Sequence, residues 1–282
     1  MEHQHEGFFQ GHGGISLFFQ IWEKQNARGT LLISPGQGEH SESYHRLVEF
    51  LKASPWNIWA WDMRGHGRSE GKRGYASHFE DYVLDYRLFL KKALADDRVR
   101  NKPLVVLGHS MGGLVQLKTL AELTDLPIAG QVCSAPLLGL SVPVPGWKQT
   151  GSQVMHMIAP EITLWNEIKN DYLTRDPDVV REFEQDVLRH DRISSGVFIG
   201  FKPAWEFVAA HAGDIRVPTL FQLPEQDPVV STPMARAVFE NLGSSSKEIL
   251  IYGDGARHEM YNDLHRKTVL ADLEKYLANF LK

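Results

Sequence analysis

Residues 103–122 read PLVVLGHSMGGLVQLKTLAE, and this stretch decides the fold. The residues before Gly108 have the length and apolar character of a buried strand, and those after Gly112 repeat apolar side chains at the period of a helix. Between them lies the pattern Gly-x-Ser-x-Gly, centred on Ser110. Such a pattern forms a sharp strand-to-helix turn in which the serine hydroxyl projects above the sheet. Ser110 is therefore the candidate nucleophile.

The same pattern occurs a second time at residues 67–71, centred on Ser69. Ser69 lies seven residues beyond Asp62, where a strand is predicted to end, and no helix-periodic segment starts behind it. The surrounding stretch, MRGHGRSEGKRGY, is polar and rich in glycine. We interpret Ser69 as a loop residue.

Strand-like apolar runs recur along the chain, at residues 15–22, 30–34, 57–62, 104–108, 128–134, 219–223 and 248–252. Helix-periodic segments separate most of them, at residues 44–52, 79–95, 112–123, 233–242 and 267–281. This alternation predicts an α/β fold with a mostly parallel sheet and helices on both faces. We expect the first run to form an antiparallel hairpin with the second at one edge of the sheet.

The connection between residues 134 and 219 is far longer than the roughly 10–12 residues that a crossover helix needs. It begins with a proline-rich stretch, continues with apolar and methionine-containing residues, and then becomes charged and helical. We assign residues 137–198 to an inserted helical cap, and residues 1–136 and 199–282 to the core. Open α/β sheets bind ligands at the carboxyl edge, so the cap's apolar residues are expected there. An extra structural layer without a role in binding is the alternative.

A serine hydroxyl needs a neighbouring base and an acid that orients this base. In strand-turn-helix hydrolases the three groups follow the chain order serine, acid, histidine. His258 follows the last predicted strand through a short loop, and Asp227 follows the strand before it. These two residues are the candidate base and acid, and Glu225 is the alternative acid. Acyl transfer also needs donors for a developing oxyanion. We expect them to be the backbone N–H groups of Met111 and of Gln37.

Composition excludes several other classes of protein. The net charge is −5 and the basic residues are interspersed with acidic ones, so nucleic acid is not an expected partner. Cys133 is the only cysteine, which rules out an internal disulfide and a multi-cysteine metal site. No secretory pattern opens the chain and no apolar run reaches the ~18 residues of a spanning helix. We expect a cytoplasmic protein that needs no metal or organic cofactor, and the sequence does not indicate its oligomeric state.

Five segments resemble the monoacylglycerol lipase and lysophospholipase branch of the α/β-hydrolases, which is grouped with the serine aminopeptidase-like family. They are SPGQGEHSESY, WDMRGHGRSEGKRGY, GHSMGG, ARHEMYND and, in the cap, DYLTRDPDVVREFEQD. The resemblance implies the α/β-hydrolase fold. It also implies that Ser110, Asp227 and His258 form the catalytic triad, with Gln37 and Met111 at the oxyanion positions. By the same resemblance Asp62, Arg64 and His66 belong to a structural loop.

The chain departs from the family's pattern in the oxyanion loop. Pro35 stands where the family usually has histidine, and Gln37 stands where a small apolar residue is common. Because the oxyanion donor is a backbone group, this difference is compatible with catalysis. It changes the pocket wall beside the acyl group.

The expected function is hydrolysis of a single-acyl-chain lipid ester, such as monoacylglycerol or lysophospholipid, through an acyl-enzyme on Ser110. The apolar cap would allow peripheral contact with a membrane. Side chains of the cap are expected to line an acyl channel: Trp147, Met155, Met157, Ile158 and Trp165.

Two other functions stay open at this point. An aminopeptidase would need a carboxylate for the free amino group of its substrate, which Glu161, Glu167 or Asp171 could supply. A binding protein with the hydrolase fold usually lacks a member of the triad, whereas this chain retains all three candidates.

Overall fold

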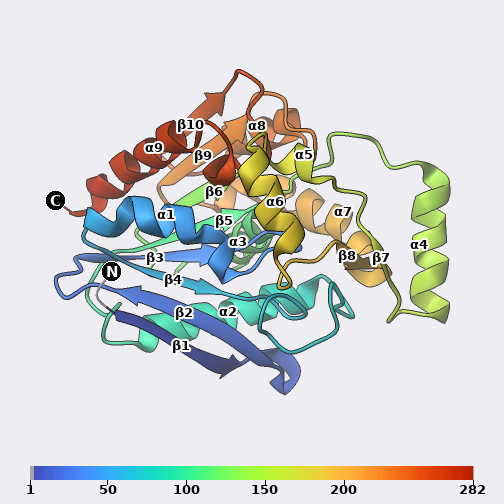
Figure 1. Cartoon of the computed structure of the whole chain (residues 1–282), viewed down its shortest axis with the longest axis horizontal. Helices are drawn as coiled ribbons and strands as arrows, with labels where there is room; N and C mark the ends of the chain where they lie inside the picture. The colour runs from blue at the N-terminus through green and yellow to red at the C-terminus, as the bar shows by residue number, and fades with distance from the viewer. Residues whose placement is uncertain (1–2, 282) are drawn as a thin grey trace.

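An eight-stranded sheet forms the centre of the computed structural model, which describes residues 3–281 (Figure 1). The strand order is β1-β2-β4-β3-β5-β6-β9-β10, and the strands from β4 to β10 are parallel. The strands are β1 (His3–Gln10), β2 (Ser16–Glu23), β3 (Gly29–Ser34), β4 (Trp56–Trp61), β5 (Leu104–His109), β6 (Gly130–Ser134), β9 (Thr219–Pro224) and β10 (Lys247–Tyr252). The predicted mostly parallel sheet is confirmed.

An antiparallel hairpin lies at one edge of the sheet, but the partner strand predicted for it is wrong. Strand β2 pairs antiparallel with β1 and with β4, whereas β3 lies between β4 and β5. Every residue of β3 is buried, and such a strand is stable only with neighbours on both sides. Strand β1 was not predicted because its sequence, HQHEGFFQ, is mostly polar, although Phe9 packs into the core.

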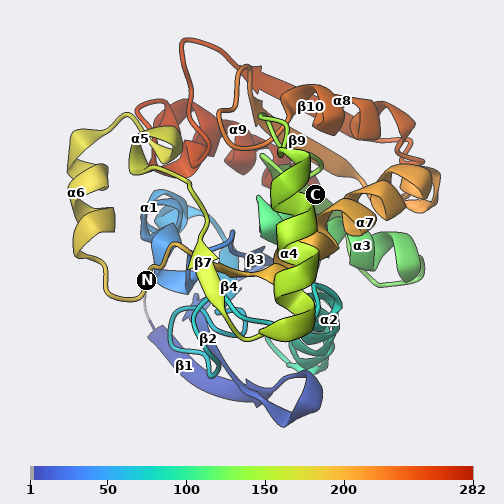
Figure 2. The same ribbon diagram turned by 90° about the vertical axis from the view of Figure 1, so that its right-hand side faces the viewer.

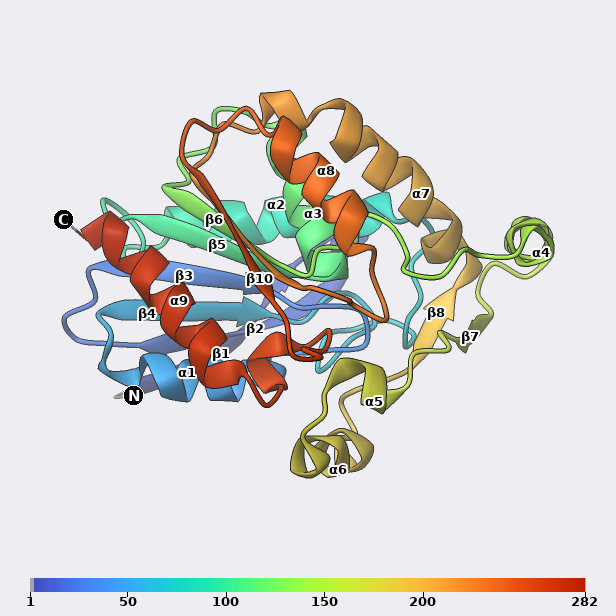
Figure 3. The same cartoon turned by 90° about the horizontal axis from the view of Figure 1, so that it is seen from above.

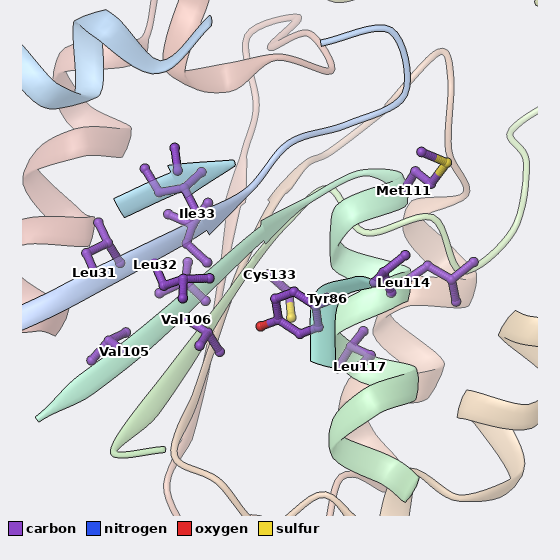
Figure 4. Packing of buried hydrophobic residues seen from close by; sticks show 14 of the residues in the cluster. Leu31, Leu32, Ile33, Tyr86, Val105, Val106, Met111, Leu114, Leu117 and Cys133 are labelled. Atoms are coloured by element: carbon purple, nitrogen blue, oxygen red, sulfur yellow. The ribbon is translucent and has the colours of Figure 1, made fainter. Parts of the chain in front are cut away.

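Helices cover both faces of the sheet (Figure 3). On one face lie α1 (His45–Phe50) and α9 (Arg266–Ala278), and on the other lie α2 (Glu80–Ala95), α3 (Met111–Glu122), α7 (Ser195–Ala210) and α8 (Thr232–Asn241). Tyr86 of α2 and Cys133 of β6 lie between Val106 of β5 and Leu117 of α3, all in one buried cluster (Figure 4). This packing explains the apolar helix-periodic pattern that follows Ser110.

The long connection between β6 and β9 lies at the carboxyl ends of the parallel strands (Figures 1 and 3). It contains α4 (Gly146–Ile158), β7 (Thr163–Trp165), α5 (Asn170–Leu173), α6 (Pro177–Gln185), β8 (Arg192–Ser194) and then α7. Strands β7 and β8 form a separate antiparallel pair. The predicted boundary between residues 198 and 199 falls inside α7, which packs against α3 of the core and α4 of the insertion. Helical continuity across residue 198 is not visible in composition.

Ion pairs fasten the insertion to the core, and two of them involve the start of α9 and the loop before it. Arg175 binds Asp263 at 2.6 Å, and Arg266 binds Asp176 at 2.7 Å. Between residues 3 and 281, no helix is both long and apolar enough to cross a bilayer.

Candidate active site

Ser110 occupies the turn between β5 and α3. Its φ of 51° and ψ of −120° lie outside the regions that L-residues normally adopt. The flanking glycines are needed because the backbone approaches itself closely: a Cβ on Gly112 would lie 2.3 Å from the carbonyl oxygen of Ser34, and one on Gly108 would lie 2.7 Å from that of Gly112. This is the strained strand-to-helix turn predicted from the Gly-x-Ser-x-Gly pattern.

Loops after the last two strands bring His258 and Asp227 to this serine. His258 Nε2 lies 2.9 Å from Ser110 Oγ, and His258 Nδ1 lies 2.7 Å from Asp227 Oδ2. The other oxygen of Asp227 accepts the backbone N–H groups of Val229 and Val230, at 2.8 and 3.2 Å. The carboxylate is therefore fixed, and it can hold the imidazole so that Nε2 accepts the serine proton.

Burial by itself would lower the pKa of His258, but the charge and hydrogen bond of Asp227 outweigh it and raise the pKa. The ring centroid of the neighbouring His109 lies 4.8 Å from that of His258, and the pKa of His109 moves in the opposite direction. Burial, followed by the charge of His258, lowers the pKa of His109 to about 3. Of the two rings, His258 is therefore the better acceptor of a proton from the serine hydroxyl.

Two backbone N–H groups beside Ser110 are free to bind a ligand. Met111 is the first residue of α3, and Gln37 lies in a turn closed by a bond from the N–H of Glu39 to the carbonyl of Gly36, at 3.3 Å. Within the described part of the chain, neither the Met111 nor the Gln37 N–H donates to another group. Both residues line the same cavity as Ser110.

Glu225 and Ser69, the alternative acid and the serine of the second Gly-x-Ser-x-Gly sequence, lie outside the hydrogen-bonded group around His258. Glu225 is exposed, and it is Asp227 that is hydrogen-bonded to His258. Ser69 Oγ accepts the N–H of Phe18 at 2.8 Å and donates to the carbonyl of Asp62 at 2.5 Å. Ser69 therefore ties a loop to the sheet.

A cavity of about 800 Å³ opens at Ser110 between the sheet and the insertion. This volume lies within the ~300–1,000 Å³ typical of small-molecule sites. Trp147, Met155 and Trp165 are part of its lining, as the sequence predicted.

Met157 and Ile158 do not line the cavity, so that part of the prediction is wrong. They are 83% and 74% exposed on the outer face of α4. At 100° per residue Met157 lies roughly 160° around the helix from Met155, which faces inward, whereas Ile158 lies only about 60° from it and is the last residue of α4. Composition alone could not distinguish the two faces.

Residues 25–265 match the sequence profile of the family described as serine aminopeptidase, S33. The chain belongs to this family. It is 27% identical over 278 residues to a monoacylglycerol lipase of Mycolicibacterium smegmatis, covering 98% of each chain. It is 26% identical over 261 residues to a phospholipase of Bacillus subtilis, covering 92% of this chain and 99% of that one. The crystal structure of a monoacylglycerol lipase of Paleococcus ferrophilus superposes with a TM-score of 0.84 at 28% identity, covering 94% and 99%.

These similarities confirm the predicted family, and the protein is a serine hydrolase with the α/β-hydrolase fold.

Part of the cavity wall of this S33 hydrolase was not predicted. It comes from apolar residues after β6, in the insertion and in α7: Leu137, Leu140, Leu164, Ile168, Phe198 and Phe201. The apolar run SGVFIGF at the start of α7 was the available signal, but it is equally typical of a core helix.

The charged side chains in the cavity wall of the S33 hydrolase neutralise one another. Lys148 Nζ binds both carboxylate oxygens of Glu167, at 2.7 and 2.6 Å. Among the described residues that line the cavity, no other Lys, Arg, Asp or Glu occurs. Glu161 and Asp171, the other carboxylates considered for an amino-group pocket, lie outside the lining.

A buried charge cluster next to His258 was missed from the sequence. Glu259 forms an ion pair with Arg189 of the insertion and accepts a bond from Asn262 at 2.9 Å. Burial raises the pKa of Glu259, and Arg189 opposes this effect. Glu39 accepts the hydroxyl of Tyr44 at 2.8 Å. Glu259 and Arg189 are 70 positions apart, so the sequence around either residue does not indicate that they pair.

Within residues 3–281, no group of three or more His, Cys, Asp or Glu is arranged to hold a metal ion.

Proposed function

We propose that this protein is a serine carboxylic-ester hydrolase that cleaves single-acyl-chain lipids, with monoacylglycerol as the best-fitting substrate class. The observation that carries the proposal is the position of Ser110, which is hydrogen-bonded to His258 and lies in the wall of a largely apolar cavity. An acyl chain gains free energy in such a cavity because its apolar surface leaves water. The named lipases and phospholipase among the relatives support the same substrate class.

The proposed reaction has two steps. Ser110 Oγ attacks the ester carbonyl while His258 Nε2 takes its proton, and the backbone N–H groups of Gln37 and Met111 bind the developing oxyanion. His258 then protonates the departing alcohol, which leaves an acyl group on Ser110. Water, deprotonated by His258, attacks the acyl-enzyme, and His258 returns this proton to Ser110 Oγ as the fatty acid leaves. Asp227 holds the imidazole throughout.

The cap proposed at residues 137–198 would supply most of the acyl-binding wall. Trp147 and Met155 on α4 and Trp165 at the end of β7 come from this segment. The cap thus excludes water from the bound chain, which strengthens the hydrogen bonds at the ester.

The neutral wall favours an alcohol that carries no charged groups. Lys148 and Glu167 bind each other, so neither is free to pair with a phosphate or with an α-amino group. Leaving a substrate charge unpaired in such a site costs free energy. This arrangement supports a glycerol ester over a lysophospholipid, and an ester over an aminopeptidase substrate.

A panel of substrates tests the proposal. We expect cleavage of monoacylglycerol with a kcat/KM at least about tenfold above that of lysophosphatidylcholine, and no measurable release from aminoacyl-naphthylamides. The tenfold figure corresponds to the roughly 1.4 kcal/mol that one unpaired polar group costs. Fatty acid and naphthylamine release are followed at equal enzyme concentration. Amide cleavage without ester cleavage would contradict the proposal, and a preference for the lysophospholipid would contradict its head-group part.

We also propose that the outer face of α4 contacts the membrane that holds the substrate. Val154, Met157 and Ile158 are exposed on this helix, and Figure 2 shows α4 at the front of the view with α6 at the left. An exposed apolar helix face of this kind binds lipid surfaces by burying its side chains in the headgroup region.

Vesicle sedimentation tests this contact. We expect the double variant Met157→Glu, Ile158→Glu to bind phosphatidylcholine vesicles at least about tenfold more weakly, because burial of one such side chain contributes roughly 1.5–3 kcal/mol. The matched control is Val187→Glu, an exposed apolar residue beyond α6. Hydrolysis of a water-soluble short ester should be unchanged in both variants. Equal vesicle binding by the wild type and the double variant would refute the contact.

A further inference from the structure

The side chain of Gln37 joins the loop beside Ser110 to the insertion. Its Oε1 accepts a bond from Asn166 Nδ2 at 2.9 Å, and its Nε2 donates to the backbone carbonyl of Arg192. Asn166 directly follows β7, and Arg192 is the first residue of β8. Both polar side-chain atoms of Gln37 are thus hydrogen-bonded to the antiparallel β7–β8 pair.

Asn166 is itself held in one orientation. Its Oδ1 accepts the N–H of Ile168 at 3.0 Å, and its backbone N–H donates to the carbonyl of Asp191 at 2.8 Å. With Oδ1 engaged, the amide nitrogen of Asn166 faces Gln37. The β7–β8 pair therefore presents a fixed donor, Asn166 Nδ2, and a fixed acceptor, the Arg192 carbonyl, that match a glutamine amide.

The backbone around Gln37 needs such a constraint. Gly36 and Gly38 flank it, and Gly38 has a φ of +83°. The N–H of His190 donates to the carbonyl of Gly38 at 3.2 Å, which fixes the far side of the turn. The N–H of Gln37 has no partner in the described chain, and peptides beside glycine rotate readily. Within this turn, the carbonyl of Gly36 shares a planar peptide unit with the Gln37 N–H and accepts the N–H of Glu39 at 3.3 Å, while the N–H of Gly36 donates to Glu39 Oε2 at 2.5 Å. The Gln37 side chain is the contact that ties this peptide to the β7–β8 pair of the insertion.

We propose that Gln37 is a positioning residue. Its side chain fastens the oxyanion loop to the β7–β8 pair and so holds the Gln37 N–H toward the ester carbonyl at Ser110. This inference rests on the proposed function. It explains why a glutamine can stand where a small apolar residue is common: the amide points to the insertion and serves as a link. The simpler alternative is that Gln37 only forms part of the pocket wall.

Paired substitutions distinguish a Gln37 side chain that links the oxyanion loop to the insertion from one that only forms part of the pocket wall. Gln37→Met keeps the backbone N–H and the length of the side chain but removes both amide bonds. Asn166→Asp keeps the acceptor for the N–H of Ile168 and removes only the donor to Gln37. The matched control is Gln185→Met, which alters an exposed glutamine at the end of α6. Melting temperatures show whether each variant is folded.

The measurements are kcat and KM on a short and a long p-nitrophenyl ester, and the rate at which a fluorophosphonate labels Ser110. Loss of a whole oxyanion donor costs roughly 10²–10³ in kcat, so a loosened donor should cost about tenfold. We expect this fall in kcat and in labelling rate for Gln37→Met and for Asn166→Asp, on both esters, with KM within about twofold. The double variant should be no slower than Gln37→Met alone, because that change already removes the bond that Asn166→Asp breaks.

Three outcomes would overturn the inference. A rise in KM for the long ester alone would identify Gln37 as pocket wall, and multiplied effects in the double variant would show independent roles. Variants as active as the wild type and Gln185→Met would show that the link is dispensable. In all three, the wild type still hydrolyses esters and the proposed function stands. A wild type that neither hydrolyses esters nor reacts with the fluorophosphonate would refute both.

Discussion

Ser110→Ala is expected to lower kcat for ester hydrolysis by at least about 10⁴-fold, because loss of the nucleophile leaves only the contribution of binding and of the oxyanion donors. The substitution removes one hydroxyl, which is hydrogen-bonded to His258 Nε2. The fold should persist, since the strained backbone of Ser110 is held by the glycine contacts around it and not by the hydroxyl. Fatty acid release and fluorophosphonate labelling are both measured.

The matched control for this variant is Ser69→Ala, which alters the other Gly-x-Ser-x-Gly sequence. Ser69 Oγ bonds the N–H of Phe18 and the carbonyl of Asp62, so its loss should lower the melting temperature and leave labelling of Ser110 intact. Activity that survives Ser110→Ala, or label that appears on Ser69, would show that the nucleophile is misassigned.

Asp227→Asn is expected to lower kcat by about 10³–10⁴-fold, because an amide no longer favours the imidazole tautomer that accepts the serine proton. The side chain keeps its size, and its oxygen can still accept the N–H groups of Val229 and Val230. The matched control is Glu225→Gln, an exposed carboxylate two residues away, which should retain wild-type activity. The reverse result would identify Glu225 as the orienting acid.

The same variant should also shift the pH dependence. His258 must be neutral to accept the serine proton, so activity falls as the pH drops through its pKa. Burial lowers this pKa, but the charge of Asp227 raises it above its ordinary value of 6.5. Removing the charge lowers the pKa, and the acid limb of the kcat/KM profile should therefore move to lower pH. An unchanged acid limb would mean that another group controls it.

Those features that depend on local pattern could be predicted from the sequence. The strand, turn and helix around Ser110 follow from adjacent residues, and the places of Asp227 and His258 follow from the strands that precede them. A parallel sheet brings the carboxyl ends of its strands to one edge, so chain order was enough to propose that these side chains meet. The structure brings them within hydrogen-bonding distance.

Other features were settled only by tertiary structure, because they join segments that are distant along the chain. Strand β3 could not be placed between β4 and β5 from its own residues, since a buried strand looks the same in any interior position. Met157 and Ile158 share the apolar character of Met155, and only packing against α7 decides which face of α4 turns inward.

By itself, the sequence determined the fold class, the family and the residues proposed for the chemistry, because periodicity, glycine placement and chain order are local properties. Tertiary structure alone decided the neutral cavity wall and the link from Gln37 to the insertion. These depend on Lys148 meeting Glu167 and on Gln37 meeting Asn166, 129 positions away. The direction of a polar side chain is set by the partners that folding brings to it, and local sequence does not record them.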